Sequence, residues 1–224
     1  MNELNTLDSN TLSKLNLQNN DDQWSIAWED NSNIFHMTLG KHLDADSRQG
    51  TAMIFETADG TVEKQSFEDV DNTSSNLAAR LRDLGYGRGD LIGLHTGQHP
   101  DTATAHMAVC KLGAVAVTLS QLYGPQSLQH ALNDCELKVL LTSEEAWGSL
   151  RDEASTLFPH LKHVLLRNPA DGEIDLAAAL DTEALSFTPD FGGADDPALL
   201  MYTSGSTGQP KGILHGHRVL AAYT

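Results

Sequence analysis

The chain has 224 residues, of which 40% are hydrophobic and 20% are charged, so it is long enough for one large domain or two small ones. Its formal net charge of −17 at pH 7 argues against nucleic acid or an anionic membrane as a partner, because phosphate groups attract Lys and Arg. The sequence starts without a signal peptide and has no apolar run that could span a bilayer, so we expect a cytoplasmic protein without membrane insertion.

A β-hairpin and a helix are the first regular elements that the sequence predicts. Residues 51–67 contain two β-rich runs that meet at Asp59-Gly60, a strong signal for a hairpin turn. Ser66 and Asp69 then form a capping box, and the apolar residues that follow recur at spacings of three and four. This spacing predicts an amphipathic helix over residues 67–84.

Strands and helices alternate over residues 91–180. The two cysteines, Cys110 and Cys135, lie in apolar helical patterns, which favours buried free thiols, with a disulfide as the alternative. The expected strands are 91–95, 114–119, 139–141 and 164–166, and the expected helices are 100–112, 125–135, 143–154 and 176–180. This alternation predicts an α/β fold with a doubly wound, mostly parallel sheet flanked by helices, preceded by the N-terminal hairpin.

Composition divides the chain into three parts. Residues 1–22 are rich in Asn, Asp, Ser and Leu and lack aromatic residues, which predicts a disordered tail. Residues 23–188 form the expected α/β subdomain. Residues 189–224 begin with a turn-rich linker, continue with a strand that leads into a polar loop, and end with the start of a further helix.

The polar loop at residues 202–212, Tyr-Thr-Ser-Gly-Ser-Thr-Gly-Gln-Pro-Lys-Gly, lies between two short apolar runs that predict buried strands. Its glycines allow the positive φ angles that let successive N–H groups surround an anion. Its hydroxyls add hydrogen-bond donors, and Lys211 adds a positive charge on a long side chain. The sequence therefore predicts a polyphosphate site formed by Thr203, Ser204, Gly205, Ser206, Thr207, Gly208 and Lys211.

Better-known loop motifs do not fit this stretch. A Walker A loop needs a second glycine where Pro210 stands, and a nucleophile elbow needs a glycine where Ser204 stands. A flexible Gly/Ser linker is disfavoured by the apolar runs on both sides. His215 and His217 would share one face of a strand, but no neighbouring ligand completes a metal site, so we expect none.

The loop resembles the phosphate-binding signature of the adenylate-forming enzymes, which include acyl-CoA synthetases, luciferases and the adenylation domains of peptide synthetases. Residues 213–220 resemble the sequence that follows this signature in short-chain acyl-CoA synthetases. The resemblance to the N-terminal part of acyl-CoA synthetases extends from about residue 24 onward, and is carried by residues 67–84, 87–90, 111–117, 124–125 and 133–134. Thr118 and Cys135 depart from the family pattern, which has a proline and a small polar residue there.

The resemblance implies an acid–thiol ligase that forms AMP. A small carboxylic acid would attack the α-phosphate of ATP to give an acyl adenylate and pyrophosphate, and coenzyme A would then take the acyl group. Lys211 would be catalytic, because with the loop it would stabilise the charge that grows on pyrophosphate. Mg²⁺ would bridge phosphate oxygens. On this interpretation the chain is the incomplete N-terminal part of a larger enzyme and is inactive alone.

Two other functions stay open at this point. An adenylation domain would deliver the acyl group to a carrier-protein thiol instead of coenzyme A. A non-catalytic nucleotide-binding or interaction module would end near residue 224. The sequence determines neither the acid nor the oligomeric state.

Overall fold

The computed structural model describes the backbone of residues 17–20 and 23–26, and residues 33–222 except 58, 182–184, 191 and 204–208. In the predicted tail, β1 (Leu17–Asn20) pairs antiparallel with β2 (Gln23–Ile26). The other residues of that tail lie outside the described part of the chain.

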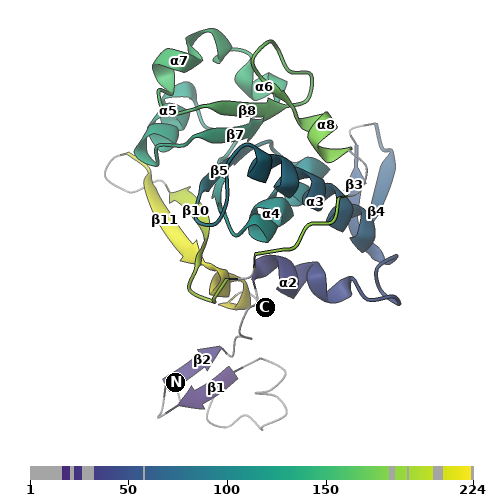
Figure 1. Ribbon diagram of the computed structural model, residues 1–224. Helices are drawn as coiled ribbons and strands as arrows, with labels where there is room; N and C mark the ends of the chain where they lie inside the picture. The colour runs from purple at the N-terminus through teal and green to yellow at the C-terminus, as the bar shows by residue number, and fades with distance from the viewer. Residues whose placement is uncertain are drawn as a thin grey trace.

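A seven-stranded sheet forms the centre of the molecule (Figure 1), with strand order β11-β10-β6-β5-β7-β8-β9. Each neighbouring pair from β10 to β9 runs parallel, and β11 pairs antiparallel with β10. The strands are β5 (Leu91–His95), β6 (Val115–Thr118), β7 (Val139–Thr142), β8 (His163–Leu166), β9 (Ile174–Asp175), β10 (Pro197–Thr203) and β11 (Lys211–Gly216). The predicted mostly parallel sheet is therefore confirmed.

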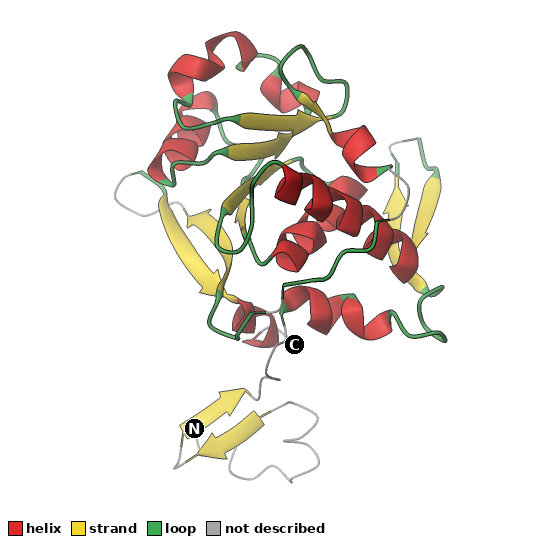
Figure 2. Ribbon diagram, in the orientation of Figure 1, coloured by secondary structure: helices red, strands yellow, loops and turns green. Residues whose placement is uncertain are grey.

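Helices cover both faces of the sheet (Figure 2). One face packs against α3 (Phe67–Asp83), α4 (Pro100–Leu112) and α8 (Leu176–Leu180). The opposite face packs against α5 (Pro125–Asp134), α6 (Glu144–Trp147) and α7 (Ala154–Leu157). Along β7, Val139 and Leu141 belong to the first core and Leu140 to the second, as the period of two along a strand requires. The doubly wound prediction is confirmed.

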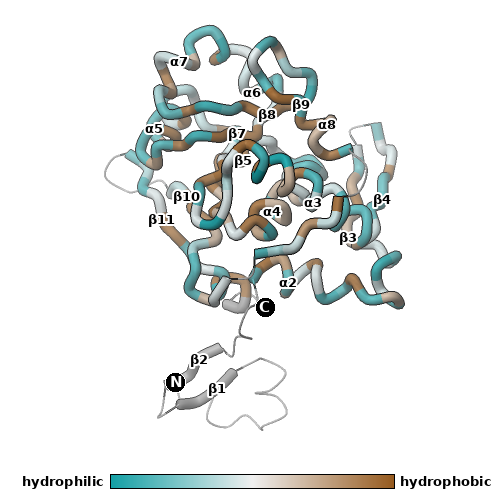
Figure 3. The backbone as a smooth tube through the Cα atoms, in the orientation of Figure 1, coloured by the Kyte–Doolittle hydropathy of each residue, from teal (hydrophilic) through white to brown (hydrophobic). Residues whose placement is uncertain are grey.

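Apolar residues concentrate on the inner strands between the helices, as the hydropathy colours along β7 and β8 show in Figure 3. Residues Val139, Leu140 and Leu141 are fully buried, with 0% exposure. A strand with both faces covered has no polar face, which explains why these strands read as continuous apolar runs.

Local signals set the boundaries of the early elements. The hairpin joins β3 (Thr51–Glu56) to β4 (Val62–Ser66), and Gly60 in its turn has φ 84°, a left-handed angle that favours glycine. At the start of α3, the Ser66 N–H donates to Asp69 Oδ2 at 2.8 Å and the Asp69 N–H donates to Ser66 Oγ at 3.1 Å. The predicted capping box is therefore present.

The helix predicted from residue 143 to residue 154 is wrong as a continuous element. Ser143 caps α6 as expected, but α6 ends at Trp147, and a 3₁₀ turn, η3 (Arg151–Glu153), separates it from α7. Arg151 stabilises the break, because its guanidinium pairs with Glu144 and Glu173. The sequence pattern kept a helical spacing across this break, and the ion pairs that hold it come partly from Glu173, far along the chain.

Lys111 is buried near the end of α4, with 1% exposure. Its ammonium donates to the Asp71 carbonyl at 2.7 Å, to Asp71 Oδ1 at 2.6 Å and to Ser75 Oγ at 2.7 Å. Nζ also lies 4.7 Å from the centre of the Phe35 ring. Burial lowers the pKa of Lys111, and the hydrogen bond and charge of Asp71 oppose that shift. Lys111 therefore joins α3 to α4 through a fully satisfied buried charge.

Candidate phosphate-binding site

The predicted phosphate loop connects β10 to β11 at the carboxyl edge of the sheet. The strand register pairs Thr203 with Lys211 and Tyr202 with Gly212, so the two ends of the loop lie opposite each other. Thr203 and Lys211, the two predicted site residues that the structure describes, are both exposed to solvent. The predicted ligands Ser204, Gly205, Ser206, Thr207 and Gly208 lie outside the described residues, so the anion nest stays a prediction.

The position of the loop in the sheet suits ligand binding. Strands β6 and β7 lie on opposite sides of β5, so the winding of the chain reverses at β5. In open α/β sheets, ligands bind beyond the carboxyl ends of the strands at such a reversal. Because β10 runs parallel to β6, the loop that follows Thr203 emerges at this same edge.

Lys211 is a free cation within the part of the chain that the structure describes. No ion pair or hydrogen bond joins its ammonium to another described side chain, whereas Arg151, Arg167 and Arg218 are each paired with a carboxylate. An exposed cation at the end of a loop of this composition is available to a phosphate group.

Tyr202 and Gly212 pack against each other at the base of the loop. Tyr202 is 7% exposed, and a Cβ on Gly212 would lie 3.3 Å from Tyr202 Cζ and 3.0 Å from Leu200 Cδ1. The Tyr202 hydroxyl donates to Asp134 Oδ2 at 2.8 Å, and burial, followed by this hydrogen bond, raises the pKa of the tyrosine. Sequence reasoning assigned no role to Gly212, and the signal that could have suggested one is its place opposite an aromatic residue in a hairpin.

His217 holds the segment after the loop to the start of the described body. It opens the 3₁₀ helix η4 (His217–Ala222) and is 1% exposed. Its Nδ1 accepts a hydrogen bond from the Ile34 N–H at 3.2 Å, and burial lowers its pKa. His215 lies on β11, and His217 follows the end of that strand, so the two do not share a strand face. His217 acts as a packed structural residue.

The linker at residues 189–196 is bound on two sides. Arg88 pairs with Asp190 and, at 2.6 Å, with Asp196. The N–H groups of His217 and Arg218 donate to linker carbonyls at 3.1 and 2.9 Å. These contacts fix the end of β11 to the loop that precedes β5.

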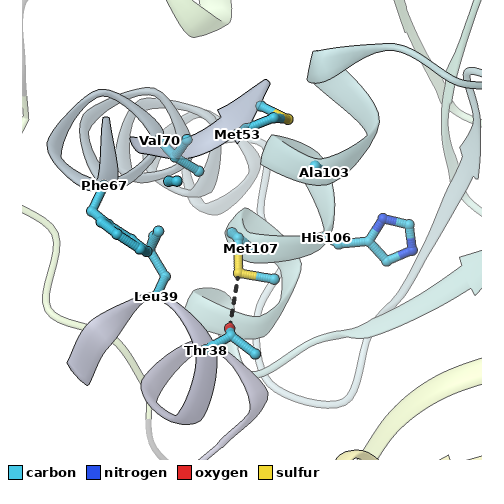
Figure 4. Close-up of a pocket in the computed structure, with 9 residues that line it drawn as sticks. Thr38, Leu39, Met53, Phe67, Val70, Ala103, His106 and Met107 are labelled. Atoms are coloured by element: carbon cyan, nitrogen blue, oxygen red, sulfur yellow. Dashed lines mark hydrogen bonds between the residues drawn. The ribbon is translucent and has the colours of Figure 1, made fainter. Parts of the chain in front are cut away.

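A separate apolar cavity lies away from the loop (Figure 4), between β3, α3, α4 and α2 (Ile34–Thr38), with a volume of about 440 Å³. The Thr38 hydroxyl donates within its own helix, to the Ile34 carbonyl at 2.7 Å. The His106 ring is turned to Thr102 and Thr118, with ring nitrogens 2.8 Å from the Thr102 carbonyl and 3.1 Å from Thr118 Oγ1. The cavity is lined by Thr38, Leu39, Ala52, Met53, Phe67, Val70, Ala103, His106 and Met107. Its polar side chains are already paired, so the cavity offers no catalytic group.

The described residues do not meet the requirements of a metal site, a membrane helix or a disulfide. No group of three or more His, Cys, Asp or Glu side chains in them is placed to hold a metal ion. None of their helices combines the length and apolar composition that crossing a bilayer requires. Cys110 is buried and Cys135 half-buried, and both are free thiols as expected.

Comparisons with known proteins agree on one family. A sequence profile described as AMP-binding enzyme matches residues 43–224. An acetyl-coenzyme A synthetase of Nostoc linckia is 29% identical over 222 residues, which cover 89% of this chain and 66% of that protein. The acetyl-coenzyme A synthetase of Burkholderia lata is 30% identical over 213 residues, covering 86% of this chain and 32% of that protein.

Solved structures show the same similarity. The anthranilate CoA ligase AuaEII in complex with anthranoyl-AMP matches with a TM-score of 0.73 and 26% identity, covering 83% of this chain and 35% of that one. An acyl-CoA synthetase of Brucella canis matches with a TM-score of 0.77 over 99% of this chain and 39% of that one, and at 20% identity it supports the fold alone. The chain thus spans between about a third and two thirds of the length of these relatives.

Proposed function

The chain belongs to the AMP-binding enzyme family, and from this premise we propose that it forms the phosphate-binding part of an enzyme that activates a carboxylic acid with ATP. The acid would be activated as an acyl adenylate and then transferred to coenzyme A. The activity of the whole protein is part of the proposal, because the chain spans only part of its relatives.

One observation carries this proposal. The loop at residues 202–212, with three glycines, four serine or threonine hydroxyls and a lysine, connects β10 to β11 at the carboxyl edge of a doubly wound sheet. Its described ends, Thr203 and Lys211, are exposed and lie opposite each other. A loop of this kind can surround a phosphate chain with N–H groups and hydroxyls while a lysine supplies charge.

The proposed reaction has two steps. In the first, a carboxylate oxygen forms a bond to the α-phosphorus of ATP, and the bond from that phosphorus to the pyrophosphate oxygen breaks. Lys211 and the loop stabilise the negative charge that grows on the departing pyrophosphate. In the second step, the coenzyme A thiol releases its proton to solvent and its sulfur forms a bond to the acyl carbon. The bond from that carbon to the phosphate oxygen of AMP breaks, and AMP leaves.

Magnesium enters this proposal as a companion of ATP rather than as a resident ion. The described residues bring no cluster of ligands together, and Mg²⁺ commonly binds through substrate phosphates with few protein ligands. We therefore expect Mg²⁺ to arrive bound to ATP and to neutralise phosphate charge.

Acetate is the first acid to test. Several relatives are named acetyl-coenzyme A synthetases, but at 28–30% identity they leave the acid open. A structural relative is named as an anthranilate ligase, so the test should also include aromatic acids.

The proposal is tested by ATP–pyrophosphate exchange with the full-length protein. We expect exchange that depends on a carboxylic acid and on Mg²⁺, measured over acetate, propionate, butyrate, benzoate and anthranilate. Product analysis with coenzyme A and with a carrier protein then identifies the thiol acceptor. ATP binding without acid-dependent exchange would instead support a non-catalytic nucleotide-binding module and would overturn the proposal.

A further inference from the structure

The base of the predicted phosphate loop is held by side chains from α5 and the turn before it. We propose that Tyr123, His130 and Asp134 are positioning residues that fix the two ends of this loop before ATP binds. The catalytic consequence rests on the proposed function, whereas the positioning itself can be measured without any nucleotide. Figure 1 shows α5 beside the β10–β11 hairpin.

The first end of the loop is held twice at Tyr202. The Tyr123 hydroxyl donates to the Tyr202 carbonyl at 3.0 Å, one residue before Thr203. The Tyr202 hydroxyl donates to Asp134 Oδ2 at 2.8 Å, so Tyr202 is held both at its backbone carbonyl and at its phenol hydroxyl. These two contacts fix the direction in which β10 enters the loop.

The second end is held by His130. Its Nε2 lies 2.8 Å from the Pro210 carbonyl oxygen, one residue before Lys211. A carbonyl can only accept, so Nε2 must carry the proton in this contact. The His130 ring also meets the Tyr202 ring edge-on, with centroids 6.3 Å apart and an interplanar angle of 79°. One side chain therefore contacts both ends of the loop.

The support for these contacts is rigid. On α5, Leu128, Ala131 and Leu132 are each no more than 2% exposed and anchor the helix to the sheet. His130 and Asp134 thus project from a packed helix, and Tyr123, in the turn just before that helix, packs against the same core. Functional geometry that is held by a rigid scaffold loses less binding energy to ordering when the ligand arrives.

The placement of the contacts predicts a selective effect on ATP. One hydrogen bond ends at Tyr202, one residue before Thr203, and the other ends at Pro210, one residue before Lys211, so each lies next to one of the two paired residues at the ends of the loop. If they are lost, the loop reaches its binding geometry for a smaller fraction of the time, and the apparent affinity for ATP falls in proportion. The affinity for the carboxylic acid should change less.

The test compares His130→Leu, which removes the donor, with His130→Gln, whose amide N–H can replace Nε2–H. His163→Leu is the matched control, because His163 also makes one hydrogen-bond contact and one edge-on ring contact, but on strand β8 and not with the loop. Its Nδ1 lies 2.8 Å from the Tyr86 hydroxyl, and its ring packs edge-on against the Tyr86 ring. Each variant is measured in the full-length protein by hydrogen–deuterium exchange of peptides covering residues 200–213 without nucleotide. The KM values for ATP and for the acid are then measured by pyrophosphate exchange.

We expect His130→Leu to speed exchange in residues 200–213 and to raise the KM for ATP about fivefold, the factor for one net hydrogen bond. The KM for the acid should change less than about twofold, because these hydrogen bonds hold only the loop that is proposed to bind the phosphates of ATP. His130→Gln should restore both readouts, and His163→Leu should leave both near wild type. Tyr123→Phe, which removes the other backbone contact and keeps the ring, is measured in the same way in case His130→Leu does not fold.

Unchanged hydrogen exchange in residues 200–213 in His130→Leu and Tyr123→Phe would overturn the positioning role. Equal effects of His130→Leu and His163→Leu would also overturn it, since that result indicates general destabilisation. A wild-type protein without acid-dependent pyrophosphate exchange would defeat the proposed function, while the hydrogen-exchange comparison would still decide the positioning role.

Discussion

Removing the charge of Asp71, which pairs with Lys111, should destabilise the protein more than removing one partner of an exposed ion pair. Asp71→Asn keeps an acceptor of the same shape but leaves a 1% exposed ammonium without its counter-charge. Breaking a fully buried pair in this way costs about 3–5 kcal/mol. The Asp71 side chain is 26% exposed, so water can partly replace the carboxylate, and we expect about 2 kcal/mol.

A double-mutant cycle separates the pair from its surroundings. Lys111→Met keeps most of the length of the side chain and removes the charge that Asp71 compensates. In that background Asp71→Asn should cost almost nothing, so the coupling energy should be about 2 kcal/mol. The matched control is the Arg48–Glu68 pair, at 2.7 Å with 44% and 31% of its side chains exposed, for which we expect about 0.5 kcal/mol or less.

The assay is urea unfolding followed by circular dichroism and by tryptophan fluorescence. Coincident transitions by the two probes would justify a two-state free energy for each variant. A coupling energy for Lys111 and Asp71 no larger than that of the Arg48–Glu68 control would show that water compensates the ammonium. The interpretation of Lys111 as a buried link between α3 and α4 would then be wrong.

Three further predictions follow from residues already described. Lys211→Ala should slow acid-dependent pyrophosphate exchange about 10²–10³-fold with an unchanged urea midpoint, and an unchanged rate would remove Lys211 from the mechanism. Gly212→Val should cost about 1–3 kcal/mol in urea unfolding, because its side chain would crowd Leu200 and Tyr202. Gly87→Val should cost less, because a Cβ there meets no atom within 4 Å, and equal losses would contradict the packing argument. Burial raises the pKa of Cys110 from 9.0 to about 12. Above pH 9 the thiol therefore ionises in the unfolded protein before it ionises in the folded one, and the free energy of unfolding falls by up to about 1.4 kcal/mol per pH unit. Cys110→Ala should have a shallower fall between pH 9 and 12, and identical slopes would show that the thiol does not contribute.

The alternation of strands and helices was predictable because each boundary carries a local signal. Pro100 begins α4, and Gly113 ends it with φ 69°, an angle that glycine adopts at little cost. Strands β5 to β8 are largely apolar on both faces, so their sequence shows that they are buried without any knowledge of their partners. The same reasoning was wrong for the apolar run after the loop, because β11 lies at the edge of the described sheet and its Ile213 and Leu214 are 44% and 57% exposed. These features depend on a few neighbouring residues, which is why sequence reasoning found them.

The contacts around the site were not predictable in the same way, because their partners are distant in sequence. Tyr202 meets Asp134, and His130 meets Pro210, through the packing of α5 against the hairpin. The burial of Lys111 depends on Asp71, on a different helix. A lysine in an amphipathic pattern ordinarily predicts a solvated side chain. The loop itself was found from its composition, but its contacts needed the three-dimensional structure.

The strand order also has a consequence for the kinetics of folding. Strands β5 to β9 pair with partners that are close in the chain, separated by at most one other strand of the sheet. By contrast, Leu199 of β10 pairs with Ala116 of β6 across β7, β8, β9 and the helices among them. Contacts of such large sequence separation carry a high loop-closure entropy and form slowly. The β5–β9 region should therefore assemble first and leave one side of β6 open as a template. The hairpin that bears the phosphate loop would dock on this template in a later and slower kinetic phase.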